Sequence, residues 1–323
     1  MAKNTNLHSA KKAKNDEFYT QLTDIEKEMK HYKEFFKGKV VYCNCDDARE
    51  SNFFKYFSMN FEFLGLKKLI TTGYKEDGKG VVLIYEGDKN GNRMVEDSEI
   101  IVRELEGNGD FRSEECIEFL KECDVVVTNP PFSLFREYVA QLMEYGKKFL
   151  IIGNLNAMGW KETFPYIKTN RMWTGYNSIV NFNTKQGVSK VGCRWYTNIA
   201  YTKREVFLDL YKKYNEDEYV KYANYDAIDV PKIEEIPIDY EGIMGVPLSF
   251  IDVFCPKQFE IIGVSTDTEE LKKLGGKPIG VDGIALMKKQ GGKAHVTPNS
   301  VELYYIKDGV FKKPFVRVFI RKK

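Results

Sequence analysis

Two consecutive prolines at positions 130 and 131 constrain this chain more than any other feature. They follow Asp124-Val125-Val126-Val127-Thr128, a β-branched run typical of a buried strand, and they precede a stretch with helical spacing over 133–145. Each proline fixes its own φ and removes a backbone donor, and each forces the residue before it toward an extended conformation. The sequence therefore predicts a rigid loop, Asn129-Pro130-Pro131-Phe132, between a strand and a helix.

This rigid loop can hold two hydrogen-bond acceptors in one place. They are the side-chain amide of Asn129 and the backbone carbonyl of Pro130, held by the extended geometry that Pro131 imposes. Two fixed acceptors suit a substrate amino group, and Phe132 adds an aromatic face for a flat ring. The chemistry that these residues imply is methylation of an exocyclic amino group.

Strands alternate with helices through the first half of the chain, which predicts an α/β fold around a parallel sheet. The segments with strand character are 39–43, 68–71, 81–85, 100–102, 124–128 and 148–152, and those with helical spacing are 20–37, 51–57, 113–122 and 133–145. After residue 155 Tyr, Trp, Asn and Gly become frequent, and only 204–214 reads as a helix. We expect a catalytic domain over 1–200 and a loop-rich recognition region over 201–323, with 155–200 assignable to either.

Composition narrows the class of protein. A hydrophobic content of 43% with 30% charged residues is typical of a soluble globular chain. No apolar run approaches the length of a membrane span, and residues 1–15 lack the apolar core of a secretory signal, so we expect a cytoplasmic protein without a membrane partner. Six cysteines without a Cys-x-x-Cys pair, and only three histidines, predict no metal site.

The formal net charge of +2 hides an asymmetry along the chain. Residues 272–323 contain thirteen Lys or Arg and three acidic residues, so this region carries +10 and residues 1–271 carry −8. A cationic region on an acidic body suits a polyanionic partner, although lysines solvated on loops would give the same count.

The Asn129–Phe132 tetrapeptide resembles the signature of DNA adenine amino-methyltransferases. Four other segments resemble, more narrowly, the EcoRI-type DNA adenine methyltransferase family, and the resemblance spans nearly the whole chain. These segments are Asp16-Glu17-Phe18-Tyr19-Thr20, Val41-Tyr42-Cys43-Asn44-Cys45-Asp46-Asp47, Cys193-Arg194-Trp195-Tyr196-Thr197-Asn198 and Met244-Gly245-Val246-Pro247-Leu248-Ser249-Phe250. The resemblance implies a Rossmann-like class I methyltransferase sheet, S-adenosylmethionine as cofactor and double-stranded DNA as substrate.

The same resemblance implies where the cofactor binds. Phe18-Tyr19-Thr20 would form the N-terminal cofactor motif, although a hydrophobic staple at a helix start explains it as well. The loop Cys45-Asp46-Asp47 stands where methyltransferases usually have glycines, and either acid could hold the methionine amino group or cap a helix. Asp110 would read the adenine amino group of the cofactor and Phe111 would pack on its ring, with a turn role for Asp110 as the alternative. Asn129 would border the cofactor as well as the target.

Duplex DNA hides the target amino group, so the adenine must be flipped out and held between apolar faces. Phe132 is the expected stacking face, and Trp195 or Tyr196, beside Arg194, is expected to supply a second one. Those two aromatics could equally be core, since alternation along a strand would bury one of them. Lys312 and Lys313, in the basic C-terminal region, are expected to contact phosphates.

The same sequence features are compatible with other functions. Asn-Pro-Pro-aromatic loops also methylate adenine in RNA or a glutamine side chain in protein, and a nucleic-acid-binding protein that has lost catalysis is a further alternative. No Gly-x-Gly-x-x-Gly occurs, which excludes a nicotinamide oxidoreductase of the usual kind. A monomer is expected, with a separately acting restriction endonuclease as a possible cognate partner.

Overall fold

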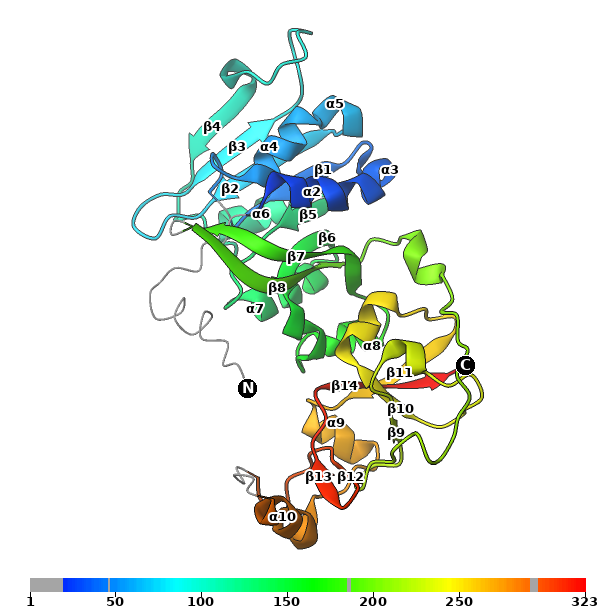
Figure 1. Cartoon of the computed structure of the whole chain (residues 1–323). Helices are drawn as coiled ribbons and strands as arrows, with labels where there is room; N and C mark the ends of the chain where they lie inside the picture. Colours follow the sequence, from blue (N-terminus) through cyan, green and yellow to red (C-terminus); the bar gives the residue numbers. More distant parts are fainter. Residues whose placement is uncertain (1–19, 46, 185–186, 291–295) are drawn as a thin grey trace. The chain divides into compact units, whose positions relative to one another are not determined.

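The computed structural model describes residues 20–45, 47–184, 187–290 and 296–323 (Figure 1). The chain divides into two compact units, one made of residues 1–155 with 172–201 and the other of residues 156–171 with 202–323. Segment 155–200 therefore contributes to both units. Each unit has its own sheet and its own hydrophobic core.

The first unit is built on a mixed eight-stranded sheet with the order β4-β3-β2-β1-β5-β6-β8-β7. Its strands are β1 (Val40–Cys43), β2 (Lys68–Gly73), β3 (Val81–Tyr85), β4 (Ile100–Glu104), β5 (Val125–Thr128), β6 (Lys148–Asn154), β7 (Trp173–Thr184) and β8 (Gly187–Thr197). Strands β2, β1, β5 and β6 run parallel, and the outer pairs are antiparallel. The α/β class and the Rossmann-like sheet predicted from the sequence are confirmed.

Helices cover both faces of this sheet. They are α2 (Leu22–Met29), η1 (Lys30–Tyr32), α3 (Lys33–Phe36), α4 (Asn52–Met59), α5 (Phe61–Leu64), η2 (Asp97–Glu99), α6 (Glu114–Glu122) and α7 (Phe135–Glu144). Val41 and Val125 pack into the core that α2 and α4 complete, whereas Tyr42 faces the opposite side, 6.1 Å from the Phe119 ring of α6. Burial on both faces explains why these strands read as continuous β-branched runs rather than as alternating ones.

A buried carboxylate fastens α2 to β7. The Glu28 side chain is fully buried and accepts hydrogen bonds from the backbone N–H groups of Tyr176 and Asn177, the Asn177 side chain and the Tyr32 hydroxyl, at 2.8–3.1 Å. Burial raises the pKa of Glu28, and these bonds oppose that rise. A Cβ on Gly175 would lie 2.2 Å from Glu28 Oε1, so glycine is required there for the carboxylate to approach.

The second unit contains a four-stranded sheet with the order β11-β14-β10-β9 and a separate β12-β13 hairpin. Its elements are η3 (Leu155–Gly159), α8 (Phe164–Lys168), η4 (Thr202–Glu205), β9 (Ile228–Asp229), η5 (Ile233–Glu235), β10 (Met244–Pro247), η6 (Leu248–Val253), β11 (Phe259–Val264), α9 (Thr268–Lys273), α10 (Gly280–Lys289), β12 (Tyr305–Lys307), β13 (Val310–Lys312) and β14 (Arg317–Lys322). A buried ion pair joins Arg317 to Asp229 at 2.8 Å across this sheet.

Among the described residues, no helix is long and apolar enough to cross a membrane.

The helix predicted over 204–214 does not form. Only the short η4 is helical, and residues 206–215 have no regular secondary structure. The side chain of Gln258 explains the difference, because it pairs with the backbone of Leu208 as a neighbouring strand would. Leu208 N–H donates to Gln258 Oε1 at 2.7 Å, and Gln258 Nε2 donates to the Leu208 carbonyl at 2.8 Å. Tertiary hydrogen bonds override the helical spacing here.

Candidate active site

The connection order of the sheet reverses beside β1. The chain leaves β1 toward β2 on one side, whereas β5 lies against β1 on the other side, and all three strands are parallel. Open α/β sheets bind ligands at such a reversal, outside the carboxyl ends of the strands. The loops that follow β1 and β5 are those that the sequence predicts to bind the cofactor and to perform catalysis.

The Asn129–Phe132 loop lies where its flanking sequence predicts, between β5 and α7. Asn129 is 9% exposed, and Leu134 N–H donates to the Pro131 carbonyl at 2.9 Å, closing the turn into the helix. The Phe132 ring is 7% exposed and packs edge-on against Phe182, with 6.1 Å between the ring centroids. The loop is therefore held on both sides, by the strand that precedes it and by the aromatic contact of its last residue.

The loop after β1 contains no glycine, but one of its residues adopts a backbone conformation typical of glycine. Cys45 adopts a left-handed backbone with φ of +67°, a region that glycine occupies at no steric cost and other residues enter at about 1–2 kcal/mol. Asp47 Oδ1 accepts hydrogen bonds from the N–H groups of Arg49 and Glu50 at 2.9 and 3.1 Å. Asp47 thus takes the turn-capping role, the alternative that the sequence left open, while Asp46 lies outside the described residues.

The N-terminal motif is described only at Thr20, since Phe18 and Tyr19 lie outside the described residues. Thr20 is buried, and its carbonyl accepts a hydrogen bond from Asn52 Nδ2 at 2.7 Å. Asn52 begins α4, the helix that follows the β1 loop. The end of the motif is therefore tied to the helix that follows the loop with which it is predicted to share the cofactor.

Asp110 and Phe111 lie just before α6, and Phe111 contacts α7, the helix that follows the Asn129–Phe132 loop. Both carboxylate oxygens of Asp110 accept hydrogen bonds from the Arg112 guanidinium, at 2.9 and 2.7 Å, and this partner lowers the pKa of Asp110. Phe111 is buried, and its ring packs edge-on against Tyr138 of α7 at 5.0 Å. Asp110 is thus ionised and oriented by Arg112.

The loop after β1, the Asn129–Phe132 loop and Phe111 therefore gather around the carboxyl ends of β1 and β5. A family model described as adenine-specific methyltransferase EcoRI matches residues 6–323. The chain belongs to this family. The resemblance seen in the sequence motifs is confirmed over nearly the full length.

Individual relatives support the assignment to the EcoRI-type family. The chain is 47% identical over 300 residues to the type II methyltransferase M.EcoRI of Escherichia coli, covering 83% of this chain and 92% of the relative. It is 42% identical over 279 residues to M.MpnI of Mycoplasma pneumoniae, covering 79% and 84%. It is 39% identical over 279 residues to M.MgeORF184P of Mycoplasma genitalium, covering 79% and 85%.

The aromatic residues expected to supply a second stacking face in this EcoRI-type chain are fully buried. Trp195 packs edge-on against Phe53 at 6.2 Å, and Tyr196 packs against Phe135 at 5.2 Å and donates its hydroxyl proton to the Asn154 carbonyl. Strand alternation was expected to bury only one ring, but both are buried because helices cover both faces of the sheet. Neither ring offers a face to a base in this structure.

The remaining predicted DNA contacts are basic. Arg194, on β8, is half-buried and donates from Nη1 to the Cys193 carbonyl at 3.2 Å. Lys312 ends β13 and is exposed, whereas Lys313 forms an ion pair with Glu302. Lys312 and Lys313 belong to the second unit, and the loops at the ends of β1 and β5 belong to the first.

Sequence reasoning missed three polar residues at the centre of the site. Asn44, Thr128 and Tyr138 are buried, Thr128 and Tyr138 each donate a hydrogen bond to Asn44, and each of the three adjoins a predicted site residue. One signal in the sequence pointed to Asn44, since it is the first polar residue after a buried strand that ends at the predicted ligand edge.

Proposed function

We propose that this protein transfers a methyl group from S-adenosylmethionine to the exocyclic amino nitrogen of adenine in double-stranded DNA. The observation that carries the proposal is the Asn129–Phe132 loop, rigid and buried, at the carboxyl end of β5 beside the loop that follows β1. Full-length membership of an adenine-specific methyltransferase family supports the same chemistry.

The chain's own contribution to this chemistry is electrostatic positioning. The lone pair of an adenine amino group is delocalised into the ring, which makes the nitrogen a weak nucleophile. Acceptors at both N–H bonds, the Asn129 side-chain oxygen and the Pro130 carbonyl, draw the nitrogen toward tetrahedral geometry and release the lone pair for attack. Preorganised groups of this kind act in the transition state without reorganising. Phe132 packs on the face of the extruded base.

The residues around β1 fit the cofactor in their chemistry. S-adenosylmethionine, when bound, supplies a methyl group already activated on a sulfonium. Asp46 would accept from its amino group, Asp110 would read its adenine and Phe111 would pack on the ring. Thr20 supports the fit, because its buried hydroxyl has no hydrogen-bond partner among the described residues and so can take a polar ligand atom.

Asp46→Ala is expected to raise the Kd of S-adenosylmethionine by about tenfold or more, since a hydrogen bond to a charged group contributes about 1.5–3 kcal/mol. Asp47→Ala should change that Kd less, because the Asp47 carboxylate caps a turn. Isothermal titration calorimetry measures both values, and Asp217→Ala removes the same charge from an exposed site of the second unit as a control. Equal affinities for all variants and the parent would remove both loop acids from the cofactor site.

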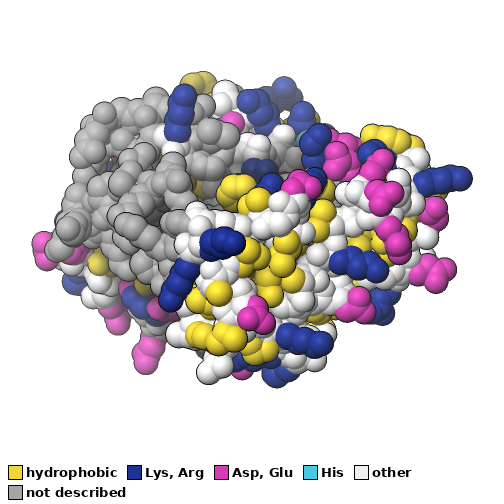
Figure 2. Space-filling view, turned by 60° about the horizontal axis from the view of Figure 1, so that its bottom comes forward, with side chains coloured by type: hydrophobic (Ala, Val, Ile, Leu, Met, Phe, Trp, Pro, Cys, Tyr) yellow, Lys and Arg dark blue, Asp and Glu magenta, His cyan; other side chains and the backbone are white. Residues whose placement is uncertain are grey.

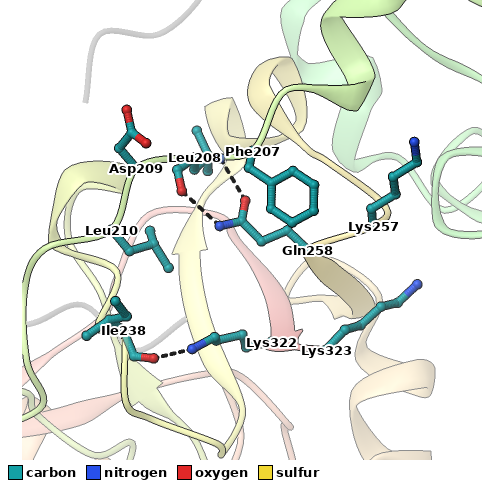
Figure 3. A pocket seen from close by; sticks show the side chains of 9 residues that line it. All are labelled: Phe207, Leu208, Asp209, Leu210, Ile238, Lys257, Gln258, Lys322 and Lys323. Atoms are coloured by element: carbon teal, nitrogen blue, oxygen red, sulfur yellow. Dashed lines mark hydrogen bonds between the residues drawn. The ribbon is translucent and has the colours of Figure 1, made fainter.

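A groove of the second unit is the best candidate for the place where this protein contacts DNA phosphates. Basic and acidic side chains are interspersed with hydrophobic ones on the face in Figure 2, so charge alone does not mark a DNA surface. The groove has a volume of about 350 Å³ and is lined by residues 207–210 and by Ile238, Lys257, Gln258, Lys322 and Lys323. Figure 3 shows Lys257 and Lys323 on the same side of the exposed Phe207 ring, whereas the Asp209 carboxylate points away. Lys257 pairs with the exposed Glu205 at 3.3 Å, and Lys323 donates to the Pro256 carbonyl at 2.6 Å. Two cations beside an aromatic ring suit a nucleic-acid strand.

Lys257→Gln combined with Lys322→Gln and Lys323→Gln is expected to flatten the dependence of DNA affinity on salt. Each lost phosphate contact reduces the slope of log affinity against log salt by about 0.9, so a reduction of about 2–3 is expected. Fluorescence anisotropy with a labelled duplex at several salt concentrations gives the slope. Lys312→Gln with Lys313→Gln, assayed in parallel, tests the sites predicted from the sequence.

The charge-matched control removes three lysines that lie near the amino ends of the parallel strands, the ends opposite the candidate active site. Lys39 precedes β1, Lys68 begins β2 and Lys121 lies in the last turn of α6. Their replacement by Gln should leave the slope unchanged. A groove variant with the same slope as the parent would remove the groove from the DNA interface.

The substrate class is tested by offering three candidates to one enzyme. Cofactor labelled in its methyl group is incubated with duplex DNA, RNA and protein under identical conditions, and the label in each is counted. The proposal predicts transfer to duplex DNA. Label confined to RNA or to glutamine of a protein would replace it with one of the two alternative methyltransferase functions. We expect the enzyme to act as a monomer, with any cognate endonuclease acting separately.

A further inference from the structure

Asn44 begins the loop after β1 and lies beside β5, the strand that leads into the Asn129–Phe132 loop. It follows β1 directly and is 3% exposed. Val41 of β1 is aligned with Val125 of β5, and continuing this parallel register along both strands places Asn44 opposite Thr128. Thr128 is fully buried and directly precedes Asn129. The last residue of the catalytic strand thus faces the first residue of the cofactor loop.

The backbone carbonyl and the side-chain oxygen of Asn44 each accept a hydrogen bond from a buried side chain. Thr128 Oγ1 donates to the Asn44 carbonyl, and the Tyr138 hydroxyl donates to Asn44 Oδ1. Cys45 Sγ lies 3.4 Å from the same Oδ1. Burial raises the pKa of Tyr138 well above its ordinary value, so its hydroxyl keeps the proton that it donates.

Tyr138 extends the link to two further parts of the site. It belongs to α7, the helix that begins directly after the catalytic loop, and it is fully buried. Its ring packs edge-on against Phe111 at 5.0 Å, and Phe111 is the residue predicted to contact the cofactor ring. The Tyr138 side chain therefore contacts both the loop after β1 and Phe111. It belongs to α7, the helix that follows the catalytic loop.

We infer that Asn44, Thr128 and Tyr138 are positioning residues that hold the catalytic loop in register with the cofactor loop. The inference rests on the proposed methyltransferase function. In-line transfer requires nitrogen, methyl carbon and sulfur to lie on one axis, and a displacement of about 1 Å can cost about a hundredfold in rate. The target nitrogen is placed by the loop after Thr128, and the methyl donor by the loop after Asn44. A direct bond between these two residues fixes the separation of the loops.

Two variants remove single hydroxyl groups from the link while keeping side-chain shape. Thr128→Val and Tyr138→Phe are each expected to lower the single-turnover rate of methyl transfer by about tenfold or more, at saturating cofactor and duplex DNA. The Kd of the cofactor should change much less than the rate. Thr128→Ser keeps the hydroxyl and should restore a rate close to that of the parent. The double variant should lose less than the product of the single losses, because both bonds act through Asn44.

Tyr42→Phe is the matched control, because it also removes one buried tyrosine hydroxyl, from β1, the strand that leads to Asn44. The Tyr42 hydroxyl is buried and pairs with Thr72 Oγ1 of β2 at 2.8 Å. Its loss should lower the Tm as Tyr138→Phe does and leave the transfer rate unchanged. If Thr128→Val and Tyr138→Phe lower only the Tm and transfer at the parent rate, the three residues are structural and the inference is overturned. A parent enzyme that methylates no DNA would instead overturn the proposed function, and this inference with it.

Discussion

Asn129→Ala is expected to lower kcat for methyl transfer by about a hundredfold or more. Asn129 is held in a rigid loop at the end of β5, where its side-chain oxygen can accept from the amino group under attack. That group becomes tetrahedral only as it reacts, so the bond serves the transition state more than the bound substrate. Cofactor and DNA affinities should therefore change little. Single-turnover rates, together with both binding constants, separate the two effects.

Two further variants sharpen the Asn129 prediction. Asn129→Asp keeps an acceptor at the same position and should be milder than Asn129→Ala. Asn60→Ala makes the same truncation at the end of α4, where the Asn60 amide donates to the Tyr56 carbonyl at 2.8 Å, and should leave the rate unchanged. An Asn129→Ala enzyme with a rate near that of the parent would contradict the mechanism.

Glu28→Ala is expected to lower the free energy of unfolding by about 3 kcal/mol or more. Each buried donor left without an acceptor costs about 1–3 kcal/mol, and the carboxylate accepts from two backbone N–H groups, one side-chain amide and one hydroxyl. The loss should loosen α2 from β7. Urea unfolding followed by circular dichroism measures the change.

Glu28→Gln should lower the free energy of unfolding less than Glu28→Ala does. The glutamine side chain keeps one oxygen that can accept, although its NH₂ group then lies against the donors that the second carboxylate oxygen had paired. Glu26→Ala is the matched control, since Glu26 lies exposed on the same helix and its loss should cost little. Equal unfolding midpoints for Glu28→Ala and Glu26→Ala would show that the buried carboxylate does not fasten α2.

The structure around the Asn129–Phe132 loop could be predicted from the sequence because its constraints are local. The β-branched run, the two prolines and the helical spacing all lie within about twenty residues, and each acts on its own neighbours. β5 covers Val125–Thr128, inside the predicted 124–128, and α7 covers Phe135–Glu144, inside the predicted 133–145. α6 covers Glu114–Glu122, inside the predicted 113–122, and the hydroxyl of its N-cap residue Ser113 accepts from the Cys116 N–H.

The contacts that organise the site could not be predicted, because they join distant segments. Thr128 and Asn44 lie 84 residues apart, and Tyr176 and Glu28 lie 148 apart. Their meeting depends on which strands are neighbours and in what register, and hydrophobic patterning does not specify either. The two predictions that failed have the same cause. Gln258 overrides the helical spacing after residue 204, and cover on both faces of the sheet buries both Trp195 and Tyr196.

The most direct test of the account identifies the atom that receives the methyl group. A duplex DNA is incubated with the parent enzyme and S-adenosylmethionine carrying a deuterated methyl group, digested to nucleosides and analysed by chromatography with mass spectrometry. The proposed function predicts the label on the exocyclic nitrogen of adenine, and its near absence when Asn129→Ala replaces the parent. Label on cytosine or on a ring nitrogen of adenine, or equal label with Asn129→Ala, would contradict it.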